Sequence, residues 1–387
     1  MKERIVQEIK RHREEIFQIA RELYEHPEIS EQEYFAEKLL TEHLEKHGFQ
    51  TEHGTCGIPT AFTAVCKGGR PGPRIAFLCE YDALEGIGHG CGHNLISAMS
   101  FGAALGLKAV LEETGGEIVV LGTPAEETNG AKVAMAREGI FKDILAALML
   151  HPDSVSKESG SSLALDALRF RFRGKTAHAS AAPEKGVNAL DAVLLMFNGI
   201  NALRQHVTDD VRMHGIIAEG GLRPNIVPDY AEARFNFRAA ERKNLNEVVE
   251  KAKECARGAA RMTGASVEID YYELSNDDMV TNPVLGRLMA KNFRYMGETE
   301  VRPASREMGS MDMGNVSHVA PAAHGFIGLG DPDLVLHTKE VAECTVSENG
   351  KKAAERGACV LALTGYDVLA SAEVQEEIRK TFAGEGR

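Results

Sequence analysis

The residues best suited to chemistry gather in a glycine-rich stretch that directly follows the apolar run RIAFL. This stretch, CEYDALEGIGHGCGHN, carries thiol, carboxylate and imidazole side chains, among them Asp82, Cys91 and His93. The glycines allow a tight backbone that aims Cys91 and His93 at one point. A thiolate and an imidazole together suit a borderline divalent cation. The stretch therefore predicts a metal site, although a Cys-x-His pair by itself is often incidental.

Further acids and a histidine lie where predicted strands end. The strand EIVVLGT leads to Glu126 and Glu127, and the strand ILAALML leads to His151. Because open α/β sheets build their sites at the carboxyl edge, we expect these side chains to converge with the Cys91 loop. Each has a structural alternative, since a Glu-Glu pair can complement a helix N-terminus and a histidine can simply end a strand. Together they favour a metal site in which the remaining carboxylates orient or deprotonate water.

The elements that must position these residues alternate between helices and strands. Helical spacing predicts one helix from residue 2 to Pro27, and Ser30 with Glu33 forms a capping-box pattern for the next helix. Strands are predicted at 60–69, 74–82, 117–123 and 144–150, with helices after the second and third of them. Strands that are apolar throughout predict a parallel or mixed sheet covered on both faces.

From about Ser162 the pattern changes. Apolar and polar residues alternate over 162–174 and 230–239, as in half-exposed antiparallel strands, and helical patterns accompany them. This predicts a small α+β domain inserted into the α/β domain. The expected division is an α/β domain formed by 1–165 and 278–387, and an inserted domain at 166–277.

Composition and charge exclude several classes of protein. The 387 residues carry a formal net charge of -13, so no basic stripe is available for nucleic acid. No apolar run reaches the roughly 18 residues that span a bilayer, and the charged N-terminus is unlike a secretory signal. Seven scattered cysteines suit a reducing compartment. We therefore expect a cytoplasmic protein with no nucleic-acid or membrane partner.

The order of these motifs resembles a known family, the aminoacylase and carboxypeptidase-type metallopeptidases. The matching segments run across almost the whole chain: EYDALEGIGHGCGHN, GTPAEE, LMLHP, GKTAHAS, GGLRPNIVPDYAEARFNFRA, GSMDMGNVSHVAP and LHTKEVAE. The likeness is greatest to the amidohydrolase branch, which includes aminoacylase-1-like β-alanyl dipeptidases and p-aminobenzoyl-glutamate hydrolases. The resemblance implies a zinc-exopeptidase-like α/β catalytic domain interrupted by an α+β lid domain, through which two copies commonly dimerise.

The resemblance also implies a site for two divalent metal ions, Zn, Mn or Co. Cys91 matches the bridging position, where relatives outside this branch usually carry Asp. Glu80, two residues before Asp82, stands where metal-binding relatives often have histidine, so Glu80 is not expected to be a ligand. The implied terminal ligands are His93, Glu127, His151 and His337.

The same resemblance implies roles for three further residues. Glu126 matches the general base, and its alternative is a hydrogen-bond acceptor outside the ligand set. Asp82 matches the acid that orients a metal-ligating imidazole. His178 matches a histidine that reaches the partner subunit's site and stabilises the oxyanion, and its alternative is a surface histidine of the lid.

The substrate's carboxylate is implied to lie against Asn225 and Arg238, because a guanidinium binds a carboxylate bidentately. Arg234 competes for this role from the same strand face, and Arg306 is a further candidate. Two departures from the family pattern bear on the leaving group: Glu85 replaces a turn proline, and the segment after the paired glutamates reads TNGAK.

The sequence therefore predicts a binuclear metal-dependent amidohydrolase for N-acyl amino acids or small dipeptide-like substrates, active as a homodimer through the lid. Alternatives within the hydrolases are a dipeptidase for β-alanyl dipeptides and a carboxypeptidase-like p-aminobenzoyl-glutamate hydrolase. Two rivals belong to other classes: a non-catalytic metal- or ligand-binding homologue, and a redox-sensing thiol protein built around Cys91. Glu126 argues against a pure binder, which would need no base beside a full ligand set.

Overall fold

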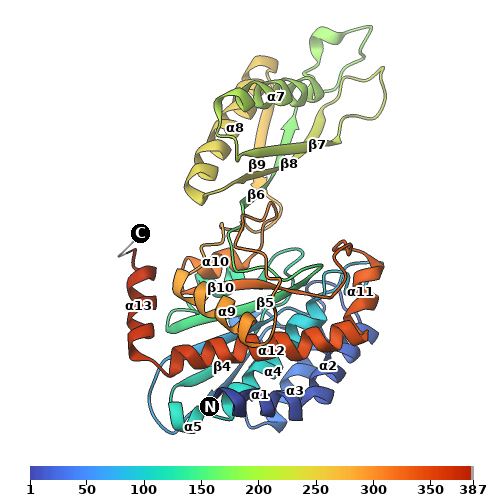
Figure 1. Ribbon diagram of the computed structural model, residues 1–387. Coiled ribbons are helices and arrows are strands. Elements are labelled where there is room, and N and C mark those ends of the chain that lie inside the picture. Colours follow the sequence, from blue (N-terminus) through green and yellow to red (C-terminus); the bar gives the residue numbers. More distant parts are fainter. Residues whose placement is uncertain (385–387) are drawn as a thin grey trace. The chain divides into compact units, whose positions relative to one another are not determined.

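The computed structural model describes residues 1–384, which form two compact units (Figure 1). The first unit comprises Met1–Ser161, Met279–Glu307 and the described part of Asp312–Arg387. The second unit comprises Ser162–Asp278 and Met308–Met311.

The first unit is built on a six-stranded sheet with the order β1-β2-β4-β3-β5-β10. Its strands are β1 (Gln50–His53), β2 (Phe62–Lys67), β3 (Arg74–Cys79), β4 (Glu117–Gly122), β5 (Ile144–Asp153) and β10 (Ala322–Gly328). Neighbours among β4, β3, β5 and β10 are parallel, whereas β1 and β2 are antiparallel. Every residue of β5 is buried, as expected for a central strand covered on both faces.

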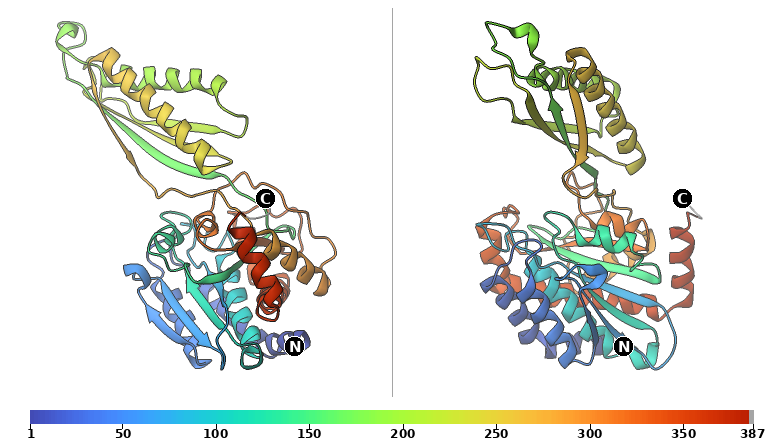
Figure 2. Two further views of the ribbon diagram at one scale, coloured as in Figure 1. Left: turned by 90° about the vertical axis from the view of Figure 1, so that its left-hand side faces the viewer. Right: turned by 180° about the vertical axis from the view of Figure 1, so that it is seen from behind.

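Helices pack around this sheet (Figure 2). They are α1 (Lys2–Arg11), α2 (Arg13–Glu25), α3 (Tyr34–Lys46), α4 (His93–Lys108), α5 (Leu111–Thr114), α6 (Ala131–Arg137), α9 (Pro283–Tyr295), α10 (Met313–Ser317), α11 (Lys339–Thr345), α12 (Glu348–Leu369) and α13 (Ala372–Phe382). Helix α4 packs against β3, β4 and β5, and α1, α2 and α12 pack against α4. Helix α4 contributes many side chains to the core between these layers, and it begins at a predicted ligand, His93.

No single helix within residues 1–384 is long and apolar enough to cross a membrane. Helices α12 and α13 reach that length and composition only as a pair, with a 98° bend between them. The apolar side chains of α12, such as Val360 and Leu361, are buried in the core of the first unit.

The second unit is an antiparallel sheet with the order β7-β8-β6-β9 and two helices. The elements are β6 (Ala164–Arg173), α7 (Ala189–Leu203), β7 (Arg212–Glu219), β8 (Tyr230–Ala239), α8 (Arg242–Thr263) and β9 (Ser266–Tyr271). Helices α7 and α8 lie on the same face of this sheet (Figure 2). Between the sheet and these helices Phe170, Phe235 and Phe237 belong to a separate core. The apolar residues of β6 and β8 therefore face inward, as their alternation with polar residues predicted.

Two local expectations were wrong. The N-terminal pattern forms two helices, because the chain breaks at His12 with φ -94° and ψ 8°. The capping box is also absent. The carboxylate of Glu28 instead accepts hydrogen bonds from the N–H groups of Phe35 and Ala36, at 2.9 and 3.0 Å. In the first unit, strands β1 and β10 were not predicted.

Candidate active site

The parallel strands bring the predicted residues to one edge of the sheet. Strands β4, β3 and β5 are neighbours, and Glu126, Asp82 and His151 lie at or just beyond their carboxyl ends. His337 arrives from the loop before α11, where its N–H donates to the Gly90 carbonyl at 2.9 Å. The predicted side chains therefore converge at the carboxyl edge of the sheet, as the sequence indicated.

The side-chain donors of the five predicted ligands lie close together. Cys91 Sγ is 3.4 Å from His151 Nε2. Glu127 Oε1 is 3.9 Å from His93 Nε2 and 3.5 Å from His337 Nε2. Three sets of donor atoms each lie within 4.8 Å of one another: Cys91, His93 and His151; Cys91, Glu127 and His337; His93, Glu126 and Glu127.

Hydrogen bonds fix the direction in which the histidine rings point. His93 Nδ1 lies 3.0 Å from Asp82 Oδ1, and His151 Nδ1 lies 2.7 Å from the Pro152 carbonyl. Each Nδ1 thus carries the proton that it donates, so Nε2 is the atom of each ring that is available to a cation. Asp82 was predicted as the acid that orients an imidazole, and its contact with His93 has that geometry.

Asp82 is held as a carboxylate by its hydrogen-bond partners. Its Oδ2 accepts from the Ser30 hydroxyl at 2.9 Å and from the Glu127 N–H at 3.0 Å. Burial acts to raise the pKa of Asp82, but the charge and hydrogen bond of His93, with these two donors, bring it well below its usual range. Ser30, predicted to cap α3, therefore serves the site.

The donor set fits a metal. His93 Nε2 and Glu127 Oε1 are buried and have no hydrogen-bond partner within residues 1–384. An unsatisfied buried polar atom costs about 1–3 kcal/mol, which coordination to a cation removes. Burial also raises the pKa of the Cys91 thiol to about 12, so a cation must displace its proton to gain the thiolate. Thiolate, imidazole and carboxylate together suit zinc and its neighbours.

The backbone at the site is specialised. Gly92, between the two predicted ligands Cys91 and His93, has φ +83°, and a Cβ there would lie 2.9 Å from Pro152 Cγ. Only glycine combines a positive φ with the absence of a Cβ that would collide with Pro152. Ala125 and His337 have φ of 61° and 66° although neither is glycine, and such strain is typical of functional sites.

Glu126 has electrostatic surroundings that favour its taking up a proton. Burial, together with the negative charges of Glu80 and Asp312, raises the pKa of Glu126 well above its usual range. A carboxylate with a raised pKa accepts a proton more readily than an ordinary one.

Sequence reasoning missed a buried ion triad beside these residues. Lys132, in the first turn of α6, has no exposed surface, and its Nζ lies 2.6 Å from Glu80 Oε1 and 2.7 Å from Asp312 Oδ1. Glu80 Oε2 is 3.5 Å from His93 Nε2, so the triad adjoins the predicted ligands. The available signal was the TNGAK departure, because it places a lysine directly after the loop that carries the paired glutamates.

Two other histidines, His89 and His324, are buried near the predicted ligands. His89 Nε2 donates to the Leu23 carbonyl at 3.1 Å, as suits a loop residue. His324, on the unpredicted strand β10, has its ring 6.0 Å from that of His151. Burial lowers the pKa of each imidazole to about 3, so both are neutral.

In the second unit, two predicted residues lie side by side. The Ala179 N–H donates to the Asn225 carbonyl at 3.1 Å, which brings His178 next to Asn225. His178 is exposed, and its Nδ1 accepts from the Ala181 N–H at 3.2 Å. A neutral His178 therefore carries its proton on Nε2, as a donor to an oxyanion must.

The arginine candidates differ in their partners. Arg238 Nη1 donates to Ser310 Oγ at 3.0 Å, and burial lowers the pKa of this guanidinium. Arg234 Nε already donates to Glu232 Oε1 at 2.7 Å. Arg306 lies exposed in the first unit. Of the two arginines on β8, Arg238 is thus the better placed to take a carboxylate from outside, because its partner is a neutral hydroxyl.

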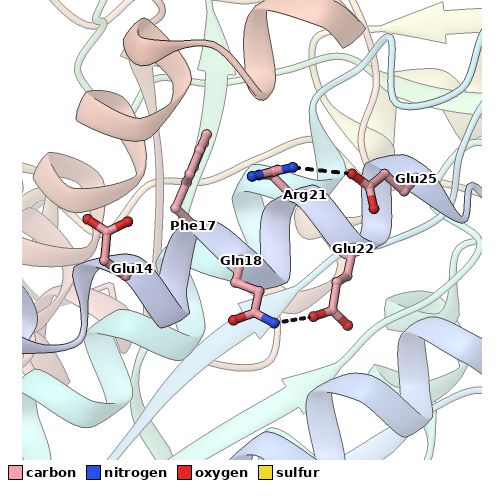
Figure 3. Close-up of a pocket in the computed structure, with 6 residues that line it drawn as sticks. All are labelled: Glu14, Phe17, Gln18, Arg21, Glu22 and Glu25. Carbon is pink, nitrogen blue, oxygen red and sulfur yellow. Dashed lines mark hydrogen bonds and ion pairs between the residues drawn. The ribbon is translucent and has the colours of Figure 1, made fainter.

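A surface pocket elsewhere contains none of these residues (Figure 3). It runs along α2, where Gln18 bonds to Glu22 at 2.7 Å and Arg21 pairs with Glu25 at 3.5 Å. These i, i+4 pairs are ordinary features of a helix surface and carry no chemistry.

Comparison with known proteins identifies the family. Residues 165–262 match the peptidase dimerisation domain of the M20 family. The chain is 35% identical to the Xaa-Arg dipeptidase of Mus musculus over 397 residues, covering 99% of this chain and 92% of that protein. It is also 35% identical over 303 residues to a component of the p-aminobenzoyl-glutamate hydrolase of Escherichia coli, covering 73% of this chain and 62% of that protein.

Solved structures share the fold. A dinuclear metal binding peptidase of the M20 family from Bacillus subtilis has a TM-score of 0.66 at 19% identity, covering 92% of this chain and 99% of that one. An aminobenzoyl-glutamate utilization protein from Klebsiella pneumoniae has a TM-score of 0.68 at 21% identity, covering 90% of this chain and 96% of that one. The predicted fold class and the resemblance are confirmed: the chain belongs to the M20 family of metal-dependent peptidases and amidohydrolases.

Proposed function

We propose that this hydrolase uses two divalent cations, Zn, Mn or Co, to cleave the amide bond of small dipeptides or N-acyl amino acids. The observation that carries the proposal is the position of Cys91. It shares one set of donor atoms with His93 and His151 and another with Glu127 and His337. His93 and Glu127 also occur in two of the three sets, but Cys91 is the thiol that lies beside both the His93–His151 pair and the Glu127–His337 pair, which supports a thiolate shared by two cations.

When bound, the cations supply Lewis-acid polarisation of the scissile carbonyl and a lowered pKa for water. Glu126 takes the proton of the attacking water and returns it to the leaving nitrogen. Asp82 keeps the His93 ring in place through Nδ1.

The second unit supplies the substrate-side groups in this proposal. His178 donates from Nε2 to the developing oxyanion, in the site of the partner copy. Asn225 and Arg238 hold the substrate's carboxylate, with Arg306 as a further candidate from the first unit. Residues 166–277 then act as the lid and dimerisation domain, and 1–165 with 278–387 as the two parts of the catalytic domain.

The relatives' names order the candidate substrates. Nearly full-length similarity to the Xaa-Arg dipeptidases of Mus musculus and Homo sapiens favours a dipeptide. Similarity to a p-aminobenzoyl-glutamate hydrolase component supports an N-acyl amino acid as the second candidate.

A substrate panel tests the proposal. Purified protein is incubated with Xaa-Arg dipeptides, β-alanyl dipeptides, N-acetyl amino acids and p-aminobenzoyl-glutamate, and the released amine is followed. We expect hydrolysis of one class, loss of activity on chelation, and recovery with Zn, Mn or Co added singly. A protein that holds metal but cleaves none of the four classes would contradict the proposal and favour a binding homologue. A hyper-reactive Cys91 thiol after metal removal, without hydrolysis, would favour a redox role.

A homodimer is supported by the edge of the second sheet. Strand β7 lies at the end of that sheet, and its Ile216 and Ile217 are 62% and 41% exposed. An apolar edge strand is a ready surface for pairing with a second copy. Sedimentation should show a dimer, and Ile216→Lys should shift it toward monomer.

The cysteines support a cytoplasmic location, which is also part of the proposal. The seven thiols are all free within the described chain, which suits a reducing compartment.

A further inference from the structure

A second cluster of imidazole and carboxylate groups lies on the outer helices of the first unit and shares no residue with the candidate active site. Its centre is the Glu15 carboxylate, in the first turn of α2. Three histidine nitrogens surround it: His12 Nδ1 at 3.1 Å, His43 Nδ1 at 2.8 Å and His47 Nε2 at 3.0 Å. We call these four residues the outer histidine cluster.

Local structure creates this convergence. His12 occupies the break between α1 and α2, which frees its ring from the helical path. His43 lies in the last turn of α3 and His47 follows at its C-cap, four positions further along, so both lie on one face. The cluster therefore joins α3 to the α1–α2 break through Glu15.

Packing holds the rings in place. The His47 ring makes edge contacts with the rings of His12 and Phe101, with centroids 4.9 and 5.7 Å apart. The His43 ring lies 5.9 Å from Phe101. The four polar side chains are only 12–25% exposed, so they are partly ordered by their surroundings yet reachable by an ion.

The donor types and spacing suit a transition metal. Tetrahedral zinc with bonds of about 2.0–2.1 Å places its donors roughly 3.4 Å apart. The His12, Glu15 and His47 donor atoms all lie within 4.8 Å of one another, so small ring movements suffice. Nitrogen and carboxylate donors are the set that zinc and its neighbours take.

A second carboxylate strengthens this interpretation. His12 Nε2 lies 3.3 Å from Glu8 Oε1. A ligating histidine characteristically donates its other N–H to a carboxylate, which fixes the tautomer and leaves the opposite nitrogen for the metal. Here Glu8 leaves His12 Nδ1 directed at Glu15. The nearby Lys108 ammonium, which bonds to the His47 carbonyl, opposes a cation and limits its affinity.

We propose that His12, Glu15 and His47, with His43 as a fourth donor, bind a divalent transition metal such as zinc, independently of the hydrolytic centre. A cation there links α3 to the α1–α2 break. The binding is therefore expected to raise the melting temperature without altering turnover.

The test counts zinc ions on the intact protein with its hydrolytic centre already loaded. Equilibrium dialysis against Zn²⁺, followed by elemental analysis, should give one more ion per chain for the wild type than for H12N/H47N. The matched control is H53N, because His53 pairs with Glu37 at 2.5 Å outside the cluster. H53N should bind zinc as the wild type does, and all three proteins should hydrolyse substrate equally.

Two further measurements guard against a folding defect in the double variant. Glu8→Gln leaves every proposed donor in place and should weaken the extra zinc by about tenfold. In the wild type, bound Zn²⁺ should protect His12 and His47, but not His53, from diethyl pyrocarbonate. Equal zinc content in wild type and H12N/H47N, or equal labelling with and without zinc, would overturn the proposal whether or not the protein is a hydrolase.

Discussion

Replacing Lys132 by methionine tests the buried triad of Lys132, Glu80 and Asp312 beside the candidate active site. Lys132 and Asp312 have no exposed surface and Glu80 is 2% exposed, so the ammonium is the nearest compensation for two buried carboxylates. Methionine preserves most of the alkyl chain and removes the charge. Glu80 and Asp312 are then left unneutralised next to Glu126 and His93.

The expected cost follows from what stays buried. Removing one partner of a buried ion pair costs roughly 3–5 kcal/mol, mainly because the other charge is left uncompensated. Two carboxylates lose their partner here, so we expect the upper part of that range. At about 2–4 °C per kcal/mol for a unit of this size, the melting temperature should fall by roughly 10–20 °C.

Thermal unfolding followed by circular dichroism measures this effect. The matched control is Lys351→Met, because Lys351 pairs with Glu14 at 2.7 Å and the Glu14 side chain is 71% exposed. Such an exposed surface pair contributes little to stability, because water screens its charges. Adding E80Q and D312N to K132M should recover much of the lost stability. A K132M protein with the same melting temperature as the wild type and the K351M control would refute the account of the triad.

Three other predictions concern single positions. Gly92→Ala should reduce the metal content of purified protein, because φ +83° and the contact with Pro152 exclude a Cβ; unchanged metal content would contradict this. Burial, reinforced by the charge of Asp82, raises the pKa of Glu33 to about 7, so the folded protein retains a proton that the unfolded chain releases. Wild-type stability should therefore fall by roughly 2–3 kcal/mol as pH rises from about 4.3 to 7, and denaturant titrations of Glu33→Gln should lack that fall. Arg238→Lys should raise KM about tenfold or more with kcat less affected, whereas Arg234→Lys should change little; the reverse order would exchange their roles.

Much of the site could be predicted because its residues follow local patterns. The strand pattern locates the ends of β3, β4 and β5, and Asp82, Glu126 and His151 lie there. Neighbouring parallel strands share one carboxyl edge, so strand-end position alone indicates proximity. The glycine-rich run around Gly92 indicated the sharp turn that its φ of +83° requires.

What escaped prediction depends on contacts between distant residues. Lys132 and Asp312 are 180 residues apart, and no local pattern indicates that they pair. Ser30 matched a capping box, but its hydroxyl donates a hydrogen bond to the distant Asp82 carboxylate instead. The break at His12 interrupts an apolar spacing that is otherwise continuous, and the His12 ring lies between the carboxylates of Glu8 and Glu15, a contact that no local pattern indicates.

The most direct test of the central claim is the metal content of Glu126→Gln measured together with its turnover. Both are determined in the H12N/H47N background, so that only the Cys91 centre contributes. We expect two cations per chain, as in the parent protein, and a kcat lower by about 10²–10⁴-fold, because the amide holds its place but accepts no proton. Undiminished turnover, or turnover in a parent protein that holds no metal, would contradict the account.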